Sequence, residues 1–435
     1  MSGSRHASAV RTGATVRIGD LEVVDHRLEV PLDHEAPDGR RIDLFAREVR
    51  HAGGGGLPWL VFLQGGPGFE ATRPLDAKGW IGAAATQRFR VLLVDQRGTG
   101  NSSPVESTHA PDASVLRHLR LDAIVRDCEL WRHQLAGEDE RWSVLGQSYG
   151  GFCAVHYLAS RPEALERVLL TGGLPPLVEI DRVYERTFAC MRRRSLEHYA
   201  SFPGDAELVG RIAARLAAGD VRLPGGDVLS VRRFQQVGMA LGQSRGSVAL
   251  HWLFESAFAG AGNEPTQRFL HAVERSQSYP TNPLYAVLHE AIYSEGPATG
   301  WSAERVRAAS GEHEWRAGEP LTLTAESIHP WMFEEYGALR PFAAAAEELA
   351  RIDDWSPLYD RARLAANRVP VAAAVYTNDL YVDRQLSLDT AAAIGGCSVY
   401  ESATHEHDGL REDGPAIFGE LLARTRRVPD PSTRA

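Results

Sequence analysis

The stretch V-L-G-Q-S-Y-G-G-F, residues 144–152, places a serine between two glycines, after an apolar run and before a helical pattern. Glycine adopts backbone conformations that other residues rarely reach, so Gly146 and Gly150 around Ser148 predict a sharp turn with a hydroxyl at its tip. The apolar letters before the turn predict a strand, and residues 151–160 have helical spacing. A G-x-S-x-G turn from strand to helix is typical of a nucleophilic serine, whereas a plain glycine-rich turn is the alternative.

Strand-like and helical runs alternate along the first part of the chain. Short apolar runs that end at glycine-rich or polar loops suit strands buried on both faces of a parallel sheet. The alternation of such strands with helices implies crossover connections, and an antiparallel pair precedes them. The expected strands are 23–31 and 41–49 for that pair, then 59–63, 91–94, 143–145 and 168–171, with helices at 114–135 and 151–160.

The pattern changes in the second half of the chain, where residues 177–355 are mainly helical and rich in Ala, Arg and aromatic residues. Alternating runs resume at 369–376 and 398–400, before a helix at 415–424. A helical cap inserted into one α/β sheet explains 435 residues better than tandem domains do. We expect a core of residues 21–176 and 356–427, a cap of residues 177–355, and disordered tails at 1–20 and 428–435.

Composition excludes several classes of protein. The net charge is −10, from 47 basic and 57 acidic residues without a basic stripe, so nucleic acid and anionic membrane surfaces are poor partners. No stretch has the length of a membrane span and the N-terminus lacks the apolar core of a secretory signal, which predicts a cytoplasmic location. No C-x-x-C spacing occurs among the four cysteines, Cys128, Cys153, Cys190 and Cys397, so we expect neither a disulfide framework nor a thiolate metal site.

A serine hydroxyl is a weak nucleophile and needs a general base that an acid holds in place. In doubly wound hydrolases these partners follow in the order serine, acid, histidine. The late strand 369–376 ends just before Asp379, which we prefer as the acid over Asp383. An aspartate at this position can also be a turn or helix cap.

The histidine is expected after the final strand, where S-A-T-H-E-H-D-G-L, residues 402–410, offers His405 and His407. We prefer His407, because the following D-G-L suits a tight loop into the last helix, and we interpret His405 as a bystander. The H-E-H-D string could also bind a metal, but the chain has no second cluster with ligand spacing. We therefore expect neither a metal nor a cofactor.

An oxyanion hole is also needed, because the tetrahedral intermediate develops negative charge. Residues 63–68, L-Q-G-G-P-G, follow the predicted strand 59–63, and their glycines let backbone N–H groups face a substrate. We expect the N–H groups of Gly66 and Tyr149 to form the hole. The stretch is not a phosphate loop, since it lacks the G-K-[ST] ending.

Three motifs in this order resemble the prolyl aminopeptidase (proline iminopeptidase) family of α/β-hydrolases: L-Q-G-G-P-G-F, D-Q-R-G-T-G-N-S-S-P at residues 95–104, and G-Q-S-Y-G-G. The late strings N-D-L-Y-V-D and E-H-D-G-L-R look like the longer bacterial members. The resemblance covers residues 23–176 and 355–424. Gln64 departs from it, since many members carry histidine at this position. The backbone donors are unaffected, but a role of the family's histidine side chain cannot be carried over to this chain.

The resemblance implies cleavage of an N-terminal residue, preferably proline, from peptides, with cap carboxylates that hold the free amine. A protonated secondary amine beside an apolar ring needs one or two acids in an aromatic pocket. The candidates lie among aromatic or apolar residues of the cap: Glu290 in L-H-E-A-I-Y, Glu326 in T-A-E-S-I-H-P-W-M-F-E and Glu255 in L-F-E-S-A-F.

We therefore predict a cofactor-free serine aminopeptidase that acts on short peptides with a free N-terminus through an acyl-enzyme. In this interpretation Ser148 attacks the carbonyl, His407 transfers the proton and Asp379 orients His407. The nearest alternative keeps the triad but hydrolyses esters or amides without a free amine. Another is a catalytically silent member of the fold used for binding, although a binding protein has no need of all three residues.

Overall fold

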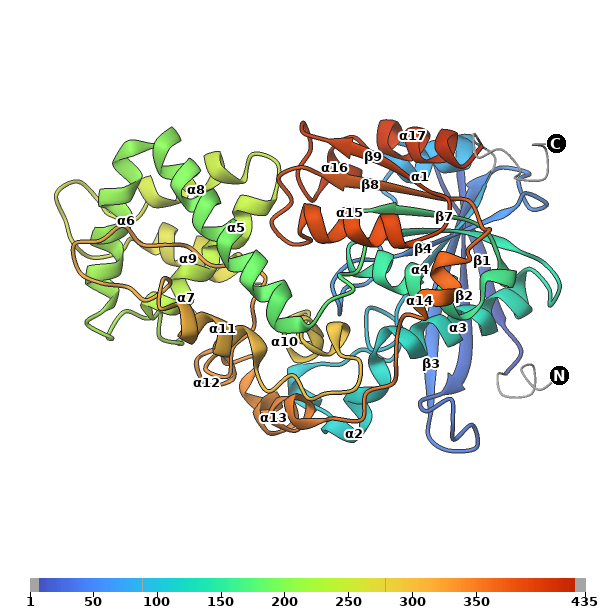
Figure 1. The fold of residues 1–435 in the computed structure, drawn as a ribbon, viewed down its shortest axis with the longest axis horizontal. Helices are drawn as coiled ribbons and strands as arrows, with labels where there is room; N and C mark the ends of the chain where they lie inside the picture. Colours follow the sequence, from blue (N-terminus) through green and yellow to red (C-terminus); the bar gives the residue numbers. More distant parts are fainter. Residues whose placement is uncertain (1–7, 88, 278, 427–435) are drawn as a thin grey trace.

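The computed structural model describes residues 8–87, 89–277 and 279–426, which form a central sheet with helices on both faces and a helical cap (Figure 1). The sheet order in the described residues is β1-β2-β3-β5-β4-β6-β7-β8-β9. Pairs from β1 to β5 are antiparallel and those from β5 onward are parallel. The predicted fold class, a mostly parallel doubly wound sheet, is confirmed. The strands are β1 (Arg11–Ile18), β2 (Leu21–Pro31), β3 (Arg41–His51), β4 (Trp59–Leu63), β5 (Arg90–Asp95), β6 (Trp142–Gln147), β7 (Leu165–Thr171), β8 (Val371–Tyr376) and β9 (Cys397–Ser402).

Two hydrophobic cores lie on opposite faces of this sheet. Val144 and Phe152 belong to the core under α3 and α4, whereas Leu145 and Phe418 belong to the core under α1 and α17. Neighbouring residues of β6 thus point to opposite faces, and both are buried, as in a sheet covered on both sides. The helices of the α/β core are α1 (Gly79–Thr86), α2 (Ala113–Leu116), α3 (Leu121–Leu135), α4 (Tyr149–Ser160), α14 (Arg361–Ala365), α15 (Arg384–Ala393), α16 (Gly409–Glu412) and α17 (Gly414–Arg426).

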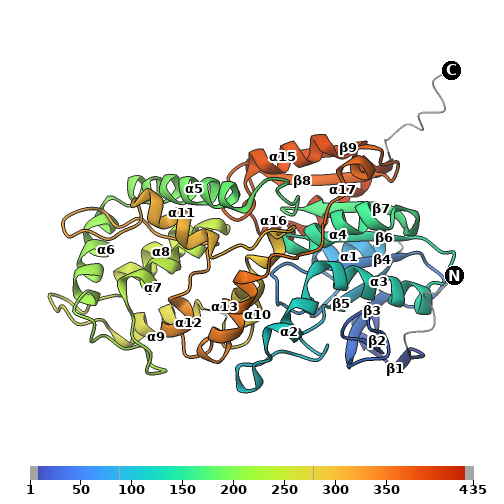
Figure 2. The same cartoon turned by 60° about the horizontal axis from the view of Figure 1, so that its bottom comes forward.

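The helical cap is formed by the chain between β7 and β8. Figures 1 and 2 show most of its helices gathered at the end of the molecule away from the sheet, with α10 between them and the core. No helix in the described parts of the chain has both the length and the apolar character needed to cross a membrane. The cap helices are α5 (Ile180–Ser201), α6 (Pro203–Leu216), α7 (Val231–Gln235), α8 (Gly246–Glu255), α9 (Gln267–Arg275), α10 (Leu284–Leu288), α11 (Ser302–Ser310), α12 (Met332–Glu335) and α13 (Ala343–Arg351).

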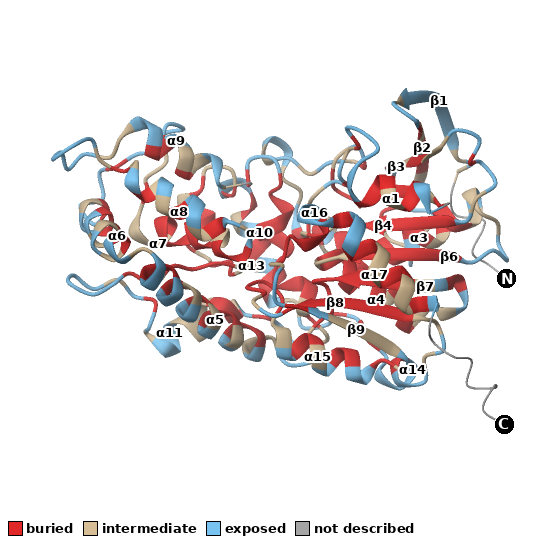
Figure 3. Ribbon diagram, turned by 90° about the horizontal axis from the view of Figure 1, so that it is seen from above, coloured by how far each residue is buried: buried red, intermediate tan, exposed pale blue. Residues whose placement is uncertain are grey.

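The N-terminal segment differs from the prediction. A disordered tail over residues 1–20 was expected, but residues 11–18 form β1, which pairs with β2 at the edge of the sheet. Nearly every side chain of β1 is exposed, as Figure 3 shows, so the strand carries no hydrophobic alternation that a sequence pattern could reveal. Backbone hydrogen bonds to β2 and an ion pair of 3.0 Å between Arg11 and Asp43 hold it. Residues 1–7 and the predicted tail 428–435 lie outside the described residues.

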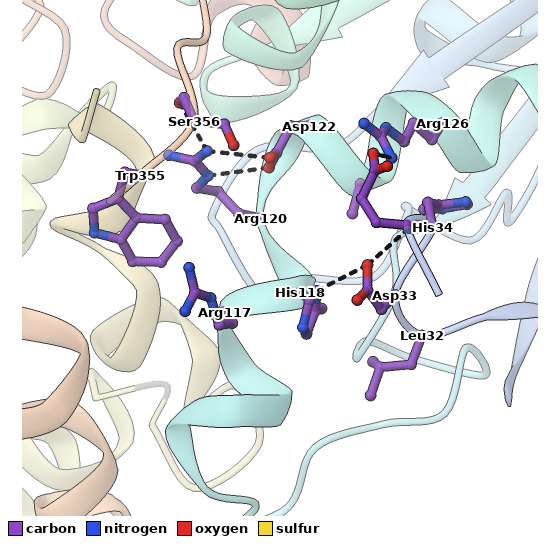
Figure 4. A pocket seen from close by; sticks show the side chains of 12 residues that line it. Leu32, Asp33, His34, Arg117, His118, Arg120, Asp122, Arg126, Trp355 and Ser356 are labelled. Carbon is purple, nitrogen blue, oxygen red and sulfur yellow. Dashed lines mark hydrogen bonds and ion pairs between the residues drawn. The ribbon is translucent and has the colours of Figure 1, made fainter. Parts of the chain in front are cut away.

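The predicted helix 114–135 is interrupted at Arg120, which adopts an extended conformation between α2 and α3. Its buried guanidinium donates to both carboxylate oxygens of Asp122, at 3.0 and 3.1 Å. It also donates to the carbonyl oxygen of Ser294 at 2.7 Å and to that of Ser356 at 3.1 Å, and Figure 4 shows the second of these bonds. The break lets one arginine join the core to the cap at Ser294 and to the segment just after the cap at Ser356, and these long-range contacts override local helix propensity.

The turn after β6 is compact because Gly150 has no side chain. A Cβ atom at Gly150 would lie 1.9 Å from the carbonyl oxygen of Leu63, at the end of β4. The first turn of α4 therefore rests directly on the carboxyl end of the neighbouring strand. This contact places the residue before the helix, Ser148, beside the loop that follows β4.

We expect Gly150→Ala to lower the free energy of unfolding by about 3 kcal/mol or more, because backbone at the centre of the sheet must move to admit the methyl group. The matched control is Gly210→Ala in α6, where a Cβ meets no described atom within 4 Å and should stabilise the helix by about 0.5 to 1 kcal/mol. Urea unfolding of both variants measures the effect. Equal stabilities would contradict the close contact at Gly150.

Candidate active site

Ser148 occupies the tip of the turn between β6 and α4, with φ 52° and ψ −127°. A non-glycine residue with positive φ is strained, and such strain persists only where the surrounding structure enforces it. Here the N–H of Ser148 donates to the carbonyl oxygen of Thr171 on β7 at 3.0 Å. On its other side, a Cβ at Gly65 would lie 2.9 Å from Cβ of Ser148. The serine is thus fixed between two neighbouring strand ends, as the G-x-S-x-G pattern predicts.

His407 and Asp379 form a buried pair next to this turn. Nδ1 of His407 lies 2.8 and 3.0 Å from the two carboxylate oxygens of Asp379. The N–H groups of Tyr381 and Val382 donate to the same carboxylate at 2.9 and 3.0 Å, which fixes its position. Burial of His407 opposes its charged form, but the adjacent carboxylate outweighs burial and raises the pKa of His407 above its ordinary value.

The other ring nitrogen of His407 faces Gln147, the residue before Ser148. Its Nε2 lies 3.4 Å from the side-chain amide nitrogen of Gln147, which can only donate. Nε2 is then the acceptor, and the ring proton sits on Nδ1, toward Asp379. This assignment, made from the hydrogen-bond partners, is the tautomer that a general base needs.

The two alternative residues from the sequence lie in other settings. Asp383 accepts the N–H of Leu386 at 3.0 Å as the N-cap of α15, and pairs with Arg186 at 3.2 Å. His405 lies 2.7 Å from the hydroxyl of Ser402. Neither belongs to the cavity that contains Ser148. The structure therefore brings together Ser148, Asp379 and His407, the three residues preferred on sequence grounds.

A cavity of ≈ 310 Å³ opens above Ser148 between the core and the cap. The core contributes the loop after β4, the turn at Gln147 and Ser148, and His407. The cap contributes side chains from several of its segments, which complete the wall of the cavity. Its lining residues from the cap are Gln236, Met239, Gln243, Ser276, Gln277, Tyr279, Tyr285, Glu326 and Tyr336.

Glu326 is an acidic residue in the wall of this cavity. Its Oε1 accepts a hydrogen bond of 2.8 Å from the hydroxyl of Tyr285, and its Oε2 lies 3.5 Å from Nε2 of His289. Burial raises the pKa of Glu326 to about 7, and the nearby Asp379 carboxylate adds to this shift. The group is therefore poised between its neutral and ionised forms near neutral pH, so a cation in the cavity would favour ionisation.

The other two predicted cap glutamates do not line the cavity, and this corrects the sequence interpretation. Glu290 is buried, but its carboxylate accepts the N–H groups of Ser302 and Ala303, at 3.2 and 2.9 Å, at the start of α11. Glu255 is exposed at the end of α8. An apolar sequence neighbourhood thus identified burial at Glu290, but not what the carboxylate faces.

The predicted oxyanion donors lie on either side of Ser148. Tyr149 is the first residue of α4, where a backbone N–H has no acceptor within the helix. Gly66 lies in the loop after β4 and lines the cavity, with φ 138°. Within the described residues, no hydrogen bond between separate elements or loops uses the N–H of either residue. Both donors remain available to a negatively charged oxygen next to the serine.

Sequence reasoning predicted an aromatic pocket but missed which residues form its walls, and it missed the amides of the cavity. Tyr279, Tyr285 and Tyr336 come from separate segments of the cap, and Tyr381 follows β8. Tyr381 lies within the N-D-L-Y-V-D string, which was the one available signal among them. The other three have no local pattern that distinguishes a cavity wall from a buried core position.

A second cavity, of ≈ 430 Å³, lies where the start of α3 meets Trp355 (Figure 4). Its charged side chains are engaged with one another: Arg120 with Asp122, and Arg126 with Glu35 at 2.5 Å. Arg120 also lies 4.6 Å from the ring centroid of Trp355. The contact with Trp355 joins core and cap and the two ion pairs lie within the core, so we interpret the cavity as structural.

Glu326 should reduce stability at neutral pH. Its carboxyl releases a proton near pH 4.5 when unfolded but near pH 7 when folded, so the free energy of unfolding falls as the pH rises between these values. We expect the free energy of unfolding of Glu326→Gln to exceed that of the parent by on the order of 3 kcal/mol at pH 8, and by much less at pH 5. Urea unfolding at both pH values tests this, with the exposed Glu255→Gln as control. A gain that is the same at both pH values would contradict the raised pKa.

The chain is similar to several known proteins. A family model described as the alpha/beta hydrolase fold matches residues 58–191. A hydrolase of known structure from Pseudomonas aeruginosa aligns with 94% of this chain and 99% of its own, at 16% identity and a TM-score of 0.38. A proline iminopeptidase from Aeromonas sobria is 44% identical, over 92% of this chain and 96% of that protein. A proline iminopeptidase from Aspergillus aculeatus is 34% identical, over 93% of this chain and 94% of that protein. The resemblance of the motifs is confirmed, and the chain belongs to the proline iminopeptidase family of α/β-hydrolases.

Proposed function

We propose that this chain is a serine aminopeptidase that releases an N-terminal proline from short peptides through an acyl-enzyme on Ser148. The family supports the activity, since the relatives matched over most of the chain are proline iminopeptidases. The observation that carries the assignment of the site is that Ser148, His407 and Glu326 line one cavity. This cavity therefore combines a nucleophile, a base and an anion that can pair with the substrate's amine.

In the first half of the reaction, the Ser148 oxygen attacks the carbonyl carbon of the N-terminal residue. Nε2 of His407 takes the hydroxyl proton, and Asp379, 2.8 Å from Nδ1, stabilises the imidazolium that forms. The N–H groups of Gly66 and Tyr149 stabilise the oxyanion of the tetrahedral intermediate. His407 then gives the proton to the leaving nitrogen, and the C–N bond breaks.

In the second half, water attacks the ester that links the prolyl group to Ser148. His407 takes a proton from this water and returns it to the serine oxygen as proline leaves. The two steps conserve protons, and they consume one water molecule; the protein's own residues supply the nucleophile of the first half, the base and the oxyanion donors.

Recognition of the N-terminal residue rests on the cap. The ammonium of the substrate faces the Glu326 carboxylate, whose ionised form it favours. Tyr279, Tyr285 and Tyr336 surround this position and offer apolar faces to the proline ring. A chain that continued beyond the amine would displace this ion pair, so the site selects a free N-terminus. The cytoplasmic location stays a prediction from the sequence.

We expect Ser148→Ala and His407→Ala each to lower kcat by on the order of 10⁴-fold or more on prolyl arylamide, because the nucleophile and base act as one unit. His405→Ala is the matched control and should stay within about tenfold of the parent. Steady-state kinetics with folded, purified variants test this. A severe loss in His405→Ala with a mild one in His407→Ala would move the base to His405.

Glu326→Gln should separate amine recognition from the chemical step. Loss of the ion pair typically costs about 2 to 5 kcal/mol, so kcat/KM for prolyl arylamide should fall by roughly 30-fold or more. A simple acyl ester without an amine should be hydrolysed nearly as before, and Glu255→Gln should change neither reaction. Equal losses on both substrates would argue against Glu326 as the amine's partner. Cleavage of acetylprolyl arylamide by the parent would instead favour a general amidase.

A further inference from the structure

A smaller cavity, of ≈ 250 Å³, adjoins the substrate cavity on the core side. The two cavities share four lining residues: Gln64, Gln147, His407 and Arg411. Glu326 and the cap tyrosines belong only to the first cavity. The second is built from core residues, chiefly the segment 72–81 and the start of α16. His407 therefore lies between a cap-lined space and a core-lined space.

The direction of the substrate follows from the function proposed above, on which this inference rests. The N-terminal ammonium lies toward Glu326, in the cap-lined cavity. The leaving nitrogen receives its proton from His407, so it must lie within hydrogen-bond reach of that ring. The chain beyond the scissile bond then continues past His407, into the core-lined cavity.

Arg411 gives this second cavity an unpaired positive charge. Its side chain is exposed and, within the described residues, makes no ion pair or side-chain hydrogen bond. The acids next to it are engaged with other partners. Asp408 accepts the N–H and hydroxyl of Ser244, at 3.0 and 2.8 Å, and Glu412 pairs with Arg245 at 2.7 Å. A guanidinium that stays free among acids is available to an anion brought by a ligand.

The opposite wall of the core-lined cavity has a large apolar part, beside Asp76 and Lys78, which pair with each other at 3.8 Å. Leu75 is 89% exposed, which is unusual for a leucine, and Pro74, Trp80 and Ile81 lie beside it. Trp80 is buried against the core, where its ring packs at 4.5 Å from that of Phe62, so this wall is anchored. An apolar side chain entering the cavity would contact Trp80 and cover Leu75 from water, and the burial of Leu75 favours binding.

We propose that the core-lined cavity binds the leaving part of a di- or tripeptide, with an apolar second residue against Leu75 and Trp80 and the C-terminal carboxylate on Arg411. One residue spans about 3.5 Å, so in such short peptides the carboxylate lies within about two residue lengths of the scissile bond. The cavity thereby prefers small zwitterionic peptides over the N-termini of long chains, which bring no carboxylate near Arg411.

The test compares prolyl-leucine with prolyl-leucinamide, which differ only in the terminal charge. We expect the parent to prefer the free acid in kcat/KM by about tenfold, and Arg411→Gln to bring this ratio close to one. The ratio should also fall in 0.5 M NaCl, because salt screens an exposed pair. Arg268→Gln is the matched control, an exposed arginine on α9 that lines neither cavity, and should keep the parent's ratio.

Two outcomes separate this inference from the function it rests on. Hydrolysis of prolyl arylamide by the parent, together with a ratio that is the same in the parent and Arg411→Gln, would overturn the role of Arg411 alone. Failure of the folded parent to hydrolyse prolyl arylamide would overturn the proposed function and the leaving-peptide site with it. Arg411→Glu gives a second readout, because it should reverse the preference in favour of the amide.

Discussion

The contact between Gly150 and the carbonyl oxygen of Leu63 fixes the geometry on which the site depends. It brings the first turn of α4 onto the end of β4, where a Cβ would come within 1.9 Å of that oxygen. Ser148 is held at the tip of this turn, and Tyr149 presents its N–H at the helix start. The loop that contains Gly66 begins directly after Leu63. A nucleophile and two donors are therefore positioned by adjacent strand ends rather than by mobile loops.

Ionisable groups around this turn influence one another. Asp379 favours the charged form of His407 but disfavours that of Glu326, whereas charged His407 and ionised Glu326 favour each other. A buried carboxyl in the same cavity as the base thus costs stability when it ionises. The arrangement is useful only if a cation enters, because the substrate's ammonium then supplies the missing charge. The buried carboxyl of Glu326 thus lowers stability at the position where recognition of the amine needs a negative charge, and such a cost is common at functional sites.

The positions of the three residues proposed for catalysis were predictable because they depend on chain order and strand ends. In a parallel sheet the carboxyl ends of β6, β8 and β9 lie at one edge, so residues that follow each strand converge there. Ser148, Asp379 and His407 each follow one of these strands.

The cap is different, because its helices carry no such geometric rule. Glu290 and Glu326 have similar apolar neighbours in the sequence, yet one caps α11 and the other faces the cavity. That difference is set by helix packing between distant segments. The edge strand β1 escaped prediction for a related reason, since backbone pairing rather than side-chain burial holds it.

Cap and core make unequal contributions to the selection of a peptide. The cap lines the substrate cavity with aromatic rings and with Glu326, which in the proposed function selects a terminal, positively charged residue. The core leaves the other side of His407 open, with Arg411 exposed at its edge. Opposite charges on the two sides of Ser148 match the polarity of a peptide and disfavour its reversed binding, because reversal would place like charges together at both ends. In the proposed function, charge thus determines the orientation of the peptide at Ser148. In the proposed function, the scissile bond is the first peptide bond because Glu326, which lines the same cavity as Ser148, holds the free amine of the first residue.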